Sequence, residues 1–216
     1  HMGLLGRPDV PSHVKSLQEF SVKFFDLVIV NLYPFEEAFH KGLKDRQLIE
    51  KIDVGGPTML RSAAKNYEFI TVVVDPKDYA FLADKLSNKK LLTLQEKKSL
   101  AAKVFAHTSA YDSLIALAFN PDLDTPKTWS ARPVQKLRYG ENPHQQATWF
   151  ARTDASEGLH KAEILQGKEL SYNNLLDLDA AWSLSLGFSK PAAVAVKHNN
   201  PCGAAENSDL TEAVQR

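Results

Sequence analysis

Two adjacent side chains near the end of the chain, Lys197 and His198, are of the types that proton transfer needs. They follow an apolar run over residues 191–196 that predicts a buried strand, and open α/β sheets hold ligands at the carboxyl ends of their strands. Histidine exchanges protons near neutral pH, and a neighbouring lysine stabilises developing negative charge. The alternative is a solvated basic pair on a loop. The position directly after a strand favours a catalytic role.

The residues around Cys202 argue against zinc chemistry. The Pro201-Cys202 step resembles part of the zinc nucleobase deaminase signature, which also needs His-x-Glu and a second cysteine. The residue three positions after Cys202 is Ala205, and Cys202 is the only cysteine in the chain. We therefore expect no metal, no intrachain disulfide, and a small buried thiol in place of a nucleophile.

A glycine turn over residues 55–58 (Gly-Gly-Pro-Thr) opens a predicted alanine-rich helix. Glycines let a ligand approach the backbone, and free amides at a helix N-terminus attract phosphate, but the same turn also serves as a tight strand-to-helix connection. It matches neither the Walker lysine loop nor the dinucleotide fingerprint. Asp53 and Lys65 are either an exposed acid and base or a pair acting on an amide near a phosphate. Tyr33 is either a rim aromatic or a hydroxyl donor in a pocket.

The elements that must position these residues alternate between strand and helix. Apolar runs over residues 25–30 and 69–74 predict two buried strands, typical of a parallel sheet. A Thr-Leu-Gln-Glu capping box begins the longest predicted helix. Helices are predicted over residues 44–52, 58–66 and 93–119. The alternation indicates an α/β domain with a largely parallel sheet.

Residues 120–133 are rich in proline and polar side chains and predict a linker, with a domain boundary near Ser130. Beyond it come a polar turn over residues 138–145, a predicted helix over residues 175–186, and the strand that leads into Lys197. This second segment has few strands to pair and would be marginal on its own.

The composition is that of an ordinary globular protein. The 216 residues are 44% hydrophobic and 24% charged, with a formal net charge of zero, so no global basic field favours nucleic acid or an anionic membrane. No apolar run approaches the length of a membrane-spanning helix. We expect a cytoplasmic location, since the lone cysteine fits a reducing compartment.

Taken in order, five segments resemble the bifunctional purine biosynthesis enzymes that join aminoimidazole carboxamide ribonucleotide (AICAR) transformylase to inosine monophosphate (IMP) cyclohydrolase. The segments are Asn31-Leu32-Tyr33-Pro34-Phe35, Ile52-Asp53-Val54-Gly55-Gly56, Arg61-Ser62-Ala63-Ala64-Lys65-Asn66, Arg138-Tyr139-Gly140-Glu141-Asn142-Pro143-His144-Gln145 and Lys197-His198-Asn199-Asn200-Pro201-Cys202-Gly203. The resemblance implies an α/β, methylglyoxal-synthase-like cyclohydrolase domain over residues 1–130. It further implies the start of a cytidine-deaminase-like α/β transformylase domain over residues 131–216.

The resemblance implies two consecutive reactions. AICAR is formylated by 10-formyltetrahydrofolate to give formyl-AICAR (FAICAR), with His198 as the base and Lys197 assisting. FAICAR then closes to IMP with loss of water, while Tyr33, Asp53 and Lys65 orient the carboxamide and stabilise the oxyanion. The residues implied in substrate binding are Arg138, Tyr139, Gly140, Asn174, Asn31, Gly55, Gly56 and Thr58. The expected partners are these small nucleotides and a second copy of the enzyme in a homodimer.

The resemblance also implies a central piece of the enzyme, cut at both ends. The family's Lys-Thr-Leu-His-Pro segment is absent, and most of the transformylase domain, with the folate site, is expected after Arg216. We therefore expect the chain alone to lack formyl transfer and to close the ring weakly or not at all. One rival interpretation is a non-catalytic nucleotide- or phosphate-binding module built on the glycine turn. Another is a purely structural or dimerisation segment.

Overall fold

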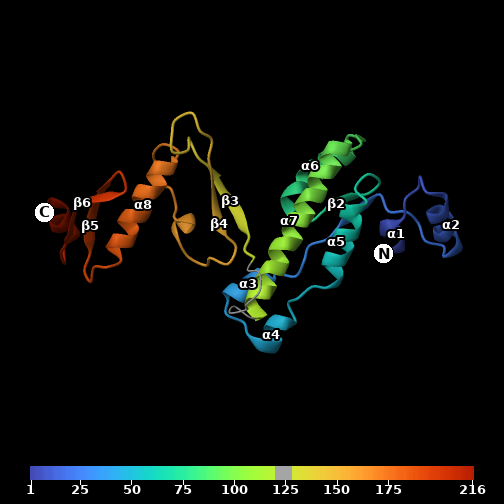
Figure 1. Ribbon diagram of the computed structural model, residues 1–216, viewed down its shortest axis with the longest axis horizontal. Coiled ribbons are helices and arrows are strands. Elements are labelled where there is room, and N and C mark those ends of the chain that lie inside the picture. The colour runs from blue at the N-terminus through green and yellow to red at the C-terminus, as the bar shows by residue number, and fades with distance from the viewer. Residues whose placement is uncertain (120–127) are drawn as a thin grey trace. The chain divides into compact units, whose positions relative to one another are not determined.

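The computed structural model describes residues 1–119 and 128–216, which form two compact units, His1–Ser130 and Ala131–Arg216 (Figure 1). Each unit has its own strands and helices, and the chain is α/β as predicted. Residues 120–127 of the predicted linker lie outside the described residues.

The first unit is built around a parallel pair of short strands, β1 (Leu27–Ile29) and β2 (Thr71–Val73). Helices α5 (Gly55–Lys65) and α7 (Leu94–Phe119) pack beside β2 (Figure 1). Small residues on α5 let the helix approach closely, and the core joins the side chains of Leu60, Ala63, Ala64, Ile70, Val72 and Val104. The predicted burial of both faces is correct for β2 but wrong for β1, where Ile29 is 46% exposed.

Helix α7 begins at the predicted capping box. The Thr93 amide donates to Glu96 Oε2 at 2.7 Å, and the Glu96 amide donates to Thr93 Oγ1 at 3.2 Å. The two bonds satisfy donors that the first helical turn leaves without partners. The helix runs to Phe119, which confirms its predicted length.

Shorter helices complete the first unit. Helix α4 is shorter than the predicted 44–52 because it covers only Asp45–Ile49. The others are α1 (Met2–Leu5), α2 (Pro11–Glu19), α3 (Phe35–His40), the 3-10 turn η1 (Pro76–Asp78) and α6 (Tyr79–Ser87). No helix in residues 1–119 and 128–216 combines the length and the apolar character that crossing a membrane requires.

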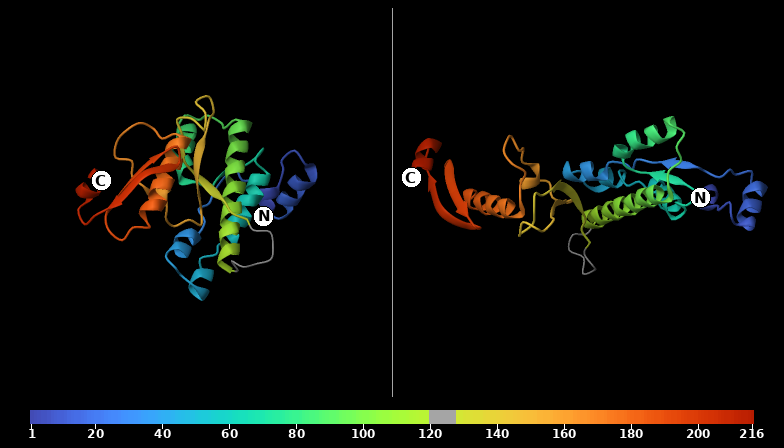
Figure 2. Two further views of the ribbon diagram at one scale, coloured as in Figure 1. Left: turned by 60° about the vertical axis from the view of Figure 1, so that its left-hand side comes forward. Right: turned by 90° about the horizontal axis from the view of Figure 1, so that it is seen from above.

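The second unit contains two antiparallel strand pairs. Strand β3 (Ala131–Lys136) pairs with β4 (Thr148–Arg152), and β5 (Ala192–Lys197) pairs with β6 (Asn200–Glu206) (Figure 2). Helix α8 (Tyr172–Ser185) packs against β5, and α9 (Leu210–Gln215) contacts both strands of the second pair. A 3-10 turn, η2 (Leu159–Lys161), precedes α8.

Two predictions about the second unit are wrong. The strand over residues 191–196 was expected to be buried, but the side chains of β5 are half-buried or exposed. Cys202 was expected to be a buried thiol, but it lies exposed on β6. Both follow from the hairpin that β5 forms with β6, because a two-stranded antiparallel ribbon leaves much of its surface open to solvent.

Candidate functional site

In the first unit, the segment after β1 meets the glycine turn. A Cβ atom placed on Gly56 would lie 2.6 Å from Asp53 Oδ2 and 2.7 Å from Leu32 Cδ2, which leaves no room for a side chain. A side chain at Gly56 would therefore have to displace Asp53 and Leu32. Because Leu32 and Asp53 both lie against Gly56, the segment that contains Tyr33 passes close to Asp53.

Asp53 caps the start of α5. The Gly56 amide donates to Asp53 Oδ1 at 2.7 Å, and a carboxylate is stabilising near the positive end of a helix. The Thr58 hydroxyl is also used locally, since it donates to the Val54 carbonyl at 2.7 Å. A Cβ atom on Gly55 would meet nothing within 4 Å, so the turn is open at that residue. The amide that a phosphate would use at Gly56 is already bound by Asp53.

Tyr111, on α7, holds the backbone just before the turn. The Asp53 amide donates to the Tyr111 hydroxyl at 2.8 Å, and that hydroxyl donates to the Lys51 carbonyl at 3.1 Å. The ring also packs edge-on against Phe35, with centroids 5.9 Å apart. Burial raises the pKa of the Tyr111 hydroxyl, which keeps its proton available for donation.

No motif in the sequence pointed to Tyr111, although a signal for it exists. Val104, Thr108 and Tyr111 follow a spacing of four and then three residues, which places them on one face of α7. Val104 and Thr108 are buried in the first unit. A tyrosine that continues such a buried stripe needs a partner for its hydroxyl.

Asn31 joins the ends of the two parallel strands. Its Nδ2 donates to the Val74 carbonyl at 3.1 Å, and the Tyr79 hydroxyl donates to its Oδ1 at 2.6 Å. Much of its hydrogen-bonding capacity thus serves the fold. Tyr33, two residues later, is 57% exposed, a position that suits either of the two predicted roles.

Lys65 lies at the opposite end of α5 from the glycine turn. It lies ten positions after Gly55, which corresponds to about 15 Å along the helix axis. The structure therefore does not bring Lys65 to Asp53. Lys65 instead lines a pocket of about 440 Å³ whose other lining residues are Leu5, Arg7, His13, Asn66, Tyr67, Glu68 and Phe69.

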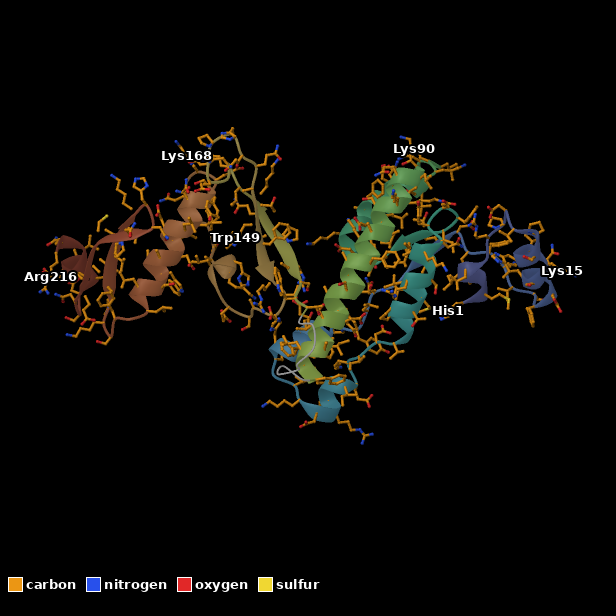
Figure 3. All side chains as sticks on the ribbon, in the orientation of Figure 1. His1, Lys15, Lys90, Trp149, Lys168 and Arg216 are labelled. Carbon is orange, nitrogen blue, oxygen red and sulfur yellow. The ribbon has the colours of Figure 1, made fainter. Side chains whose placement is uncertain are left out.

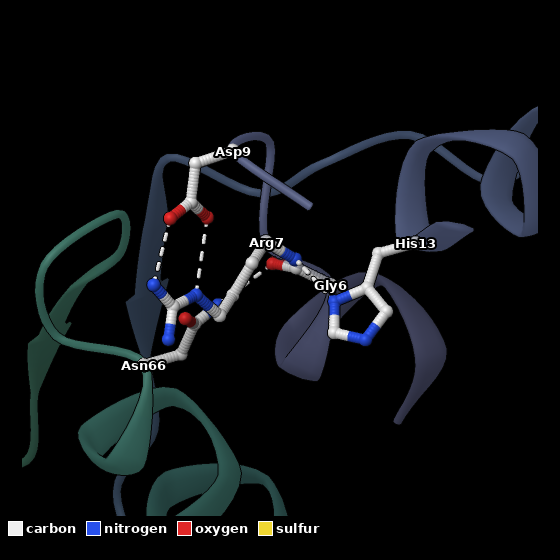
Figure 4. A network of polar contacts seen from close by, with 5 residues as sticks. All are labelled: Gly6, Arg7, Asp9, His13 and Asn66. Carbon is white, nitrogen blue, oxygen red and sulfur yellow. Dashed lines mark hydrogen bonds and ion pairs between the residues drawn. The ribbon is translucent and has the colours of Figure 1, made fainter. Parts of the chain in front are cut away.

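Asn66 organises one wall of this Lys65 pocket. The residue is buried, and its Nδ2 donates to the carbonyls of Leu4 at 3.1 Å and Gly6 at 2.8 Å. Arg7 follows directly, and its guanidinium forms two hydrogen bonds to Asp9 (Figure 4). The Arg7 amide donates to Nδ1 of His13 at 3.3 Å. The pocket therefore combines the basic side chains of Arg7 and Lys65 and the acidic Glu68 with a fixed backbone.

In the second unit, Arg138 and Tyr139 follow β3 and are bonded to the start of α8. The Arg138 amide donates to the Leu170 carbonyl at 2.9 Å, and the Tyr172 amide donates to the Tyr139 carbonyl at 3.2 Å. The Arg138 guanidinium lies over the Tyr139 ring, 4.9 Å from its centroid. Hydrogen bonds with Ser171 and then with Arg138 lower the pKa of the Tyr139 hydroxyl.

Gly140 closes the polar turn that follows. Its amide donates to the Gln145 carbonyl at 2.9 Å, and the Gln145 side chain accepts from the Asn142 amide at 2.9 Å. A Cβ atom on Gly140 would lie 3.0 Å from the Cβ of Gln145. A side chain at Gly140 would therefore press on Gln145, which would have to move slightly.

Asn174 belongs to the capping box of α8. Its Oδ1 accepts from the Ser171 amide at 3.1 Å, so its Nδ2 is the group suited to a ligand. Asn174 and Arg138 line one depression of about 540 Å³. The remaining lining residues are Lys168, Glu169, Leu170, Asp177, Leu178, Ala181 and Val196. Lys168 is labelled in Figure 3.

Lys197 and His198 stand at a tight hairpin turn and not at a strand-to-helix crossover. Lys197 pairs with Asn200, while His198 and Asn199 adopt left-handed φ values of 53° and 61°. The Asn199 amide donates to Asp177 Oδ1 at 2.7 Å, which ties the turn to α8 beside the depression. The hairpin thus lies close to Arg138 and Asn174. Lys197 and His198 are themselves exposed.

Two family models match the chain. One, described as the AICARFT/IMPCHase bienzyme, matches residues 63–216, and the other, an MGS-like domain, matches residues 3–58. The chain belongs to the AICARFT/IMPCHase bienzyme family. This confirms the resemblance that the five sequence segments indicated.

Relatives of the family are similar over the whole chain. The bifunctional purine biosynthesis proteins PurH of Bacillus cytotoxicus and Bacillus mycoides are each 47% identical over 222 residues, covering 100% of this chain and 43% of the relative. The chain thus spans less than half the length of these relatives. A crystal structure of ForH aligns at 33% identity with a TM-score of 0.46, covering 55% of this chain and 61% of that one. Among the described residues, no group of three or more His, Cys, Asp or Glu side chains is placed to hold a metal ion.

Proposed function

We propose that the chain carries residues for the last two steps of IMP synthesis, formylation of AICAR and dehydrative closure of FAICAR. The observation that carries the proposal is the convergence of distant motifs in the second unit. Arg138, Asn174 and Asp177 line one depression, and Asp177 accepts a hydrogen bond from the turn that contains His198. Membership of the bienzyme family supports the same reaction pair.

In the formyl transfer, the amine of AICAR attacks the formyl carbon of 10-formyltetrahydrofolate, and the bond from that carbon to the folate nitrogen breaks. The co-substrate supplies the formyl group. His198 accepts the amine proton, and Lys197 stabilises negative charge on the formyl oxygen and helps return a proton to the leaving nitrogen. Arg138, Tyr139, Gly140 and Asn174 would hold the nucleotide.

In the ring closure, the carboxamide nitrogen of FAICAR attacks the formyl carbon and water leaves. The Gly56 amide fixes the Asp53 carboxylate, which suits orientation of a carboxamide, and Tyr33 would donate from the neighbouring segment. The role of Lys65 stays a prediction. Because it lies at the far end of α5, it would have to reach the nucleotide from a different side.

We further propose the domain assignment that the resemblance implies. The MGS-like match over residues 3–58 supports a methylglyoxal-synthase-like cyclohydrolase domain over residues 1–130 with a parallel sheet. The cytidine-deaminase-like start of a transformylase domain over residues 131–216, the homodimer, the cytoplasmic location and the absence of a metal requirement rest on the resemblance.

The test compares two variants in the enzyme expressed from its complete reading frame. His198→Ala should lower formyl transfer about 100-fold or more while ring closure continues. Asp53→Ala should lower ring closure and leave formyl transfer in place. Formylation of AICAR and conversion of FAICAR to IMP are followed separately by absorbance. Equal losses of both activities in both variants, or no turnover in the parent enzyme, would refute the proposal. The 216-residue chain should show no formyl transfer and little ring closure.

A nucleotide-binding module without catalysis is the second candidate, and the amine of Lys65 in the Lys65 pocket favours it. In that case Lys65→Ala and Asp53→Ala would weaken nucleotide binding while ring closure by the complete enzyme stayed unchanged. Calorimetry with IMP separates the third possibility, because a purely structural segment would release no heat.

A further inference from the structure

Tyr111 is the residue through which α7 contacts the Asp53 turn by hydrogen bonds. Its hydroxyl accepts from the Asp53 amide at 2.8 Å and donates to the Lys51 carbonyl at 3.1 Å, so one oxygen fixes the peptide groups on both sides of Ile52. The Tyr111 ring lies 58 residues from Asp53 in sequence. The contact is therefore tertiary and depends on the packing of α7 in the first unit.

The Asp53 side chain is held independently of its backbone. The Gly56 amide donates to Oδ1 at 2.7 Å. The other carboxylate oxygen, Oδ2, packs against the Cα of the same glycine, where a Cβ atom would have no space. The backbone is held by Tyr111 and the carboxylate by α5. If either the Tyr111 bonds or the Gly56 bond were lost, the carboxylate would no longer be held in one orientation.

We propose that Tyr111 is a positioning residue for Asp53 in the ring-closure reaction, an inference that rests on the proposed cyclohydrolase function. The hydroxyl fixes the position of the Lys51–Asp53 backbone relative to α7. The position of this backbone in turn sets the orientation of the Asp53 carboxylate toward the substrate carboxamide. Tyr111 acts through Asp53 and does not itself touch the reacting atoms.

The ring and the hydroxyl have separable functions. The ring packs edge-on against Phe35 at 5.9 Å, and Tyr111→Phe keeps this contact while it removes both hydrogen bonds. Ser113→Ala is a matched control on the same helix, because the Ser113 hydroxyl donates to the Ser109 carbonyl one turn earlier. Both variants delete a single hydroxyl from α7, but only Tyr111→Phe reaches the Asp53 turn.

The first measurement is steady-state kinetics on the enzyme from its complete reading frame. Tyr111→Phe should lower kcat for ring closure about tenfold, because small misplacements of a catalytic group have effects of this order, with KM changed less than about twofold. Formyl transfer should stay at the parental rate. Ser113→Ala should match the parent enzyme in both reactions. An unchanged kcat in Tyr111→Phe would overturn the inference, whereas a parent enzyme without ring closure would refute the proposed function itself.

A double variant separates positioning from general structure. If Tyr111 acts through the carboxylate, adding Tyr111→Phe to Asp53→Asn should lower kcat by less than about twofold more, because residues in one network are not additive. A full tenfold additional loss would contradict the proposal.

A second measurement needs no turnover. In the 216-residue chain, Tyr111→Phe should speed hydrogen exchange of the Asp53 amide by about tenfold or more. The amide would then have no hydrogen bond to the hydroxyl that must break before it exchanges. Ser113→Ala should leave this exchange unchanged. Slow exchange of the Asp53 amide in Tyr111→Phe would show that the hydroxyl does not hold the turn.

Discussion

The two adjacent glycines of the turn give a paired prediction about stability. A Cβ atom at Gly56 would lie 2.6 Å and 2.9 Å from the Asp53 carboxylate and 2.7 Å from Leu32, all shorter than a methyl group tolerates. Gly56→Ala must therefore displace both side chains, and overpacking of this kind costs about 1–3 kcal/mol. At Gly55 a Cβ meets nothing within 4 Å. Gly55→Ala should be neutral or more stable by about 0.4–1 kcal/mol, because it restricts the unfolded chain.

Urea unfolding followed by far-ultraviolet circular dichroism measures both variants under the same conditions. Gly56→Ala should unfold at a lower urea concentration than the parent, and Gly55→Ala at the same or a higher one. Gly56→Ala should also slow ring closure in the complete enzyme, since it moves the Asp53 carboxylate. Equal unfolding midpoints for the two variants would refute the close packing at Gly56.

Two further predictions concern side chains that organise the pockets. Asn66→Ala removes the two hydrogen bonds to the carbonyls of Leu4 and Gly6 in a buried place; it should destabilise the first unit by about 1–3 kcal/mol and speed proteolysis of the N-terminal segment. Ser171→Ala removes the larger cause of the lowered pKa of Tyr139; an NMR titration of the Tyr139 ring should show that pKa move up toward the ordinary value for tyrosine.

Each of these variants has a control of the same chemistry. Asn88→Ala removes an exposed amide that donates to Asp84, one turn earlier in α6. It should change the free energy of unfolding by less than about 0.5 kcal/mol. Ser185→Ala removes a hydroxyl at the other end of α8, and the Tyr139 titration should not respond. Protection of the N-terminal segment in Asn66→Ala, or an unmoved Tyr139 pKa in Ser171→Ala, would contradict the corresponding contact.

Local signals in the sequence predicted the elements of the first unit well. The capping box at Thr93 and the apolar spacing behind it depend only on neighbours along the helix, so the start and end of α7 could be read directly. The glycines and proline at residues 55–57 likewise indicated a helix start, predicted at residue 58, and the structure begins α5 three residues earlier, at Gly55. The short length of β1 and the exposure of Ile29 depend on what packs against the strand. The sequence of one segment does not contain that information.

The candidate site was harder to predict, because its geometry is tertiary. The hairpin at Lys197 requires two non-glycine residues with positive φ, an arrangement that residue propensities disfavour and that the contact with Asp177 supports. The link between Tyr111 and Asp53 joins residues far apart in the chain. The separation of Asp53 from Lys65 follows simply from the straight helix between them. Linear motifs identified these residues but did not show which of them meet.

The carboxylate at the start of α5 decides what kind of group suits the glycine turn. A phosphate carries a charge of about −1.5 to −2, and two like unit charges 4 Å apart repel by about 4 kcal/mol near a protein surface. A phosphate at Gly56 would have to overcome this repulsion and displace the 2.7 Å hydrogen bond to Asp53. A neutral carboxamide faces neither obstacle, because its N–H groups can donate to the same carboxylate. The turn is therefore better suited to an amide group than to a phosphate, which favours the proposed catalytic role of Asp53 over a phosphate-binding module built on these glycines.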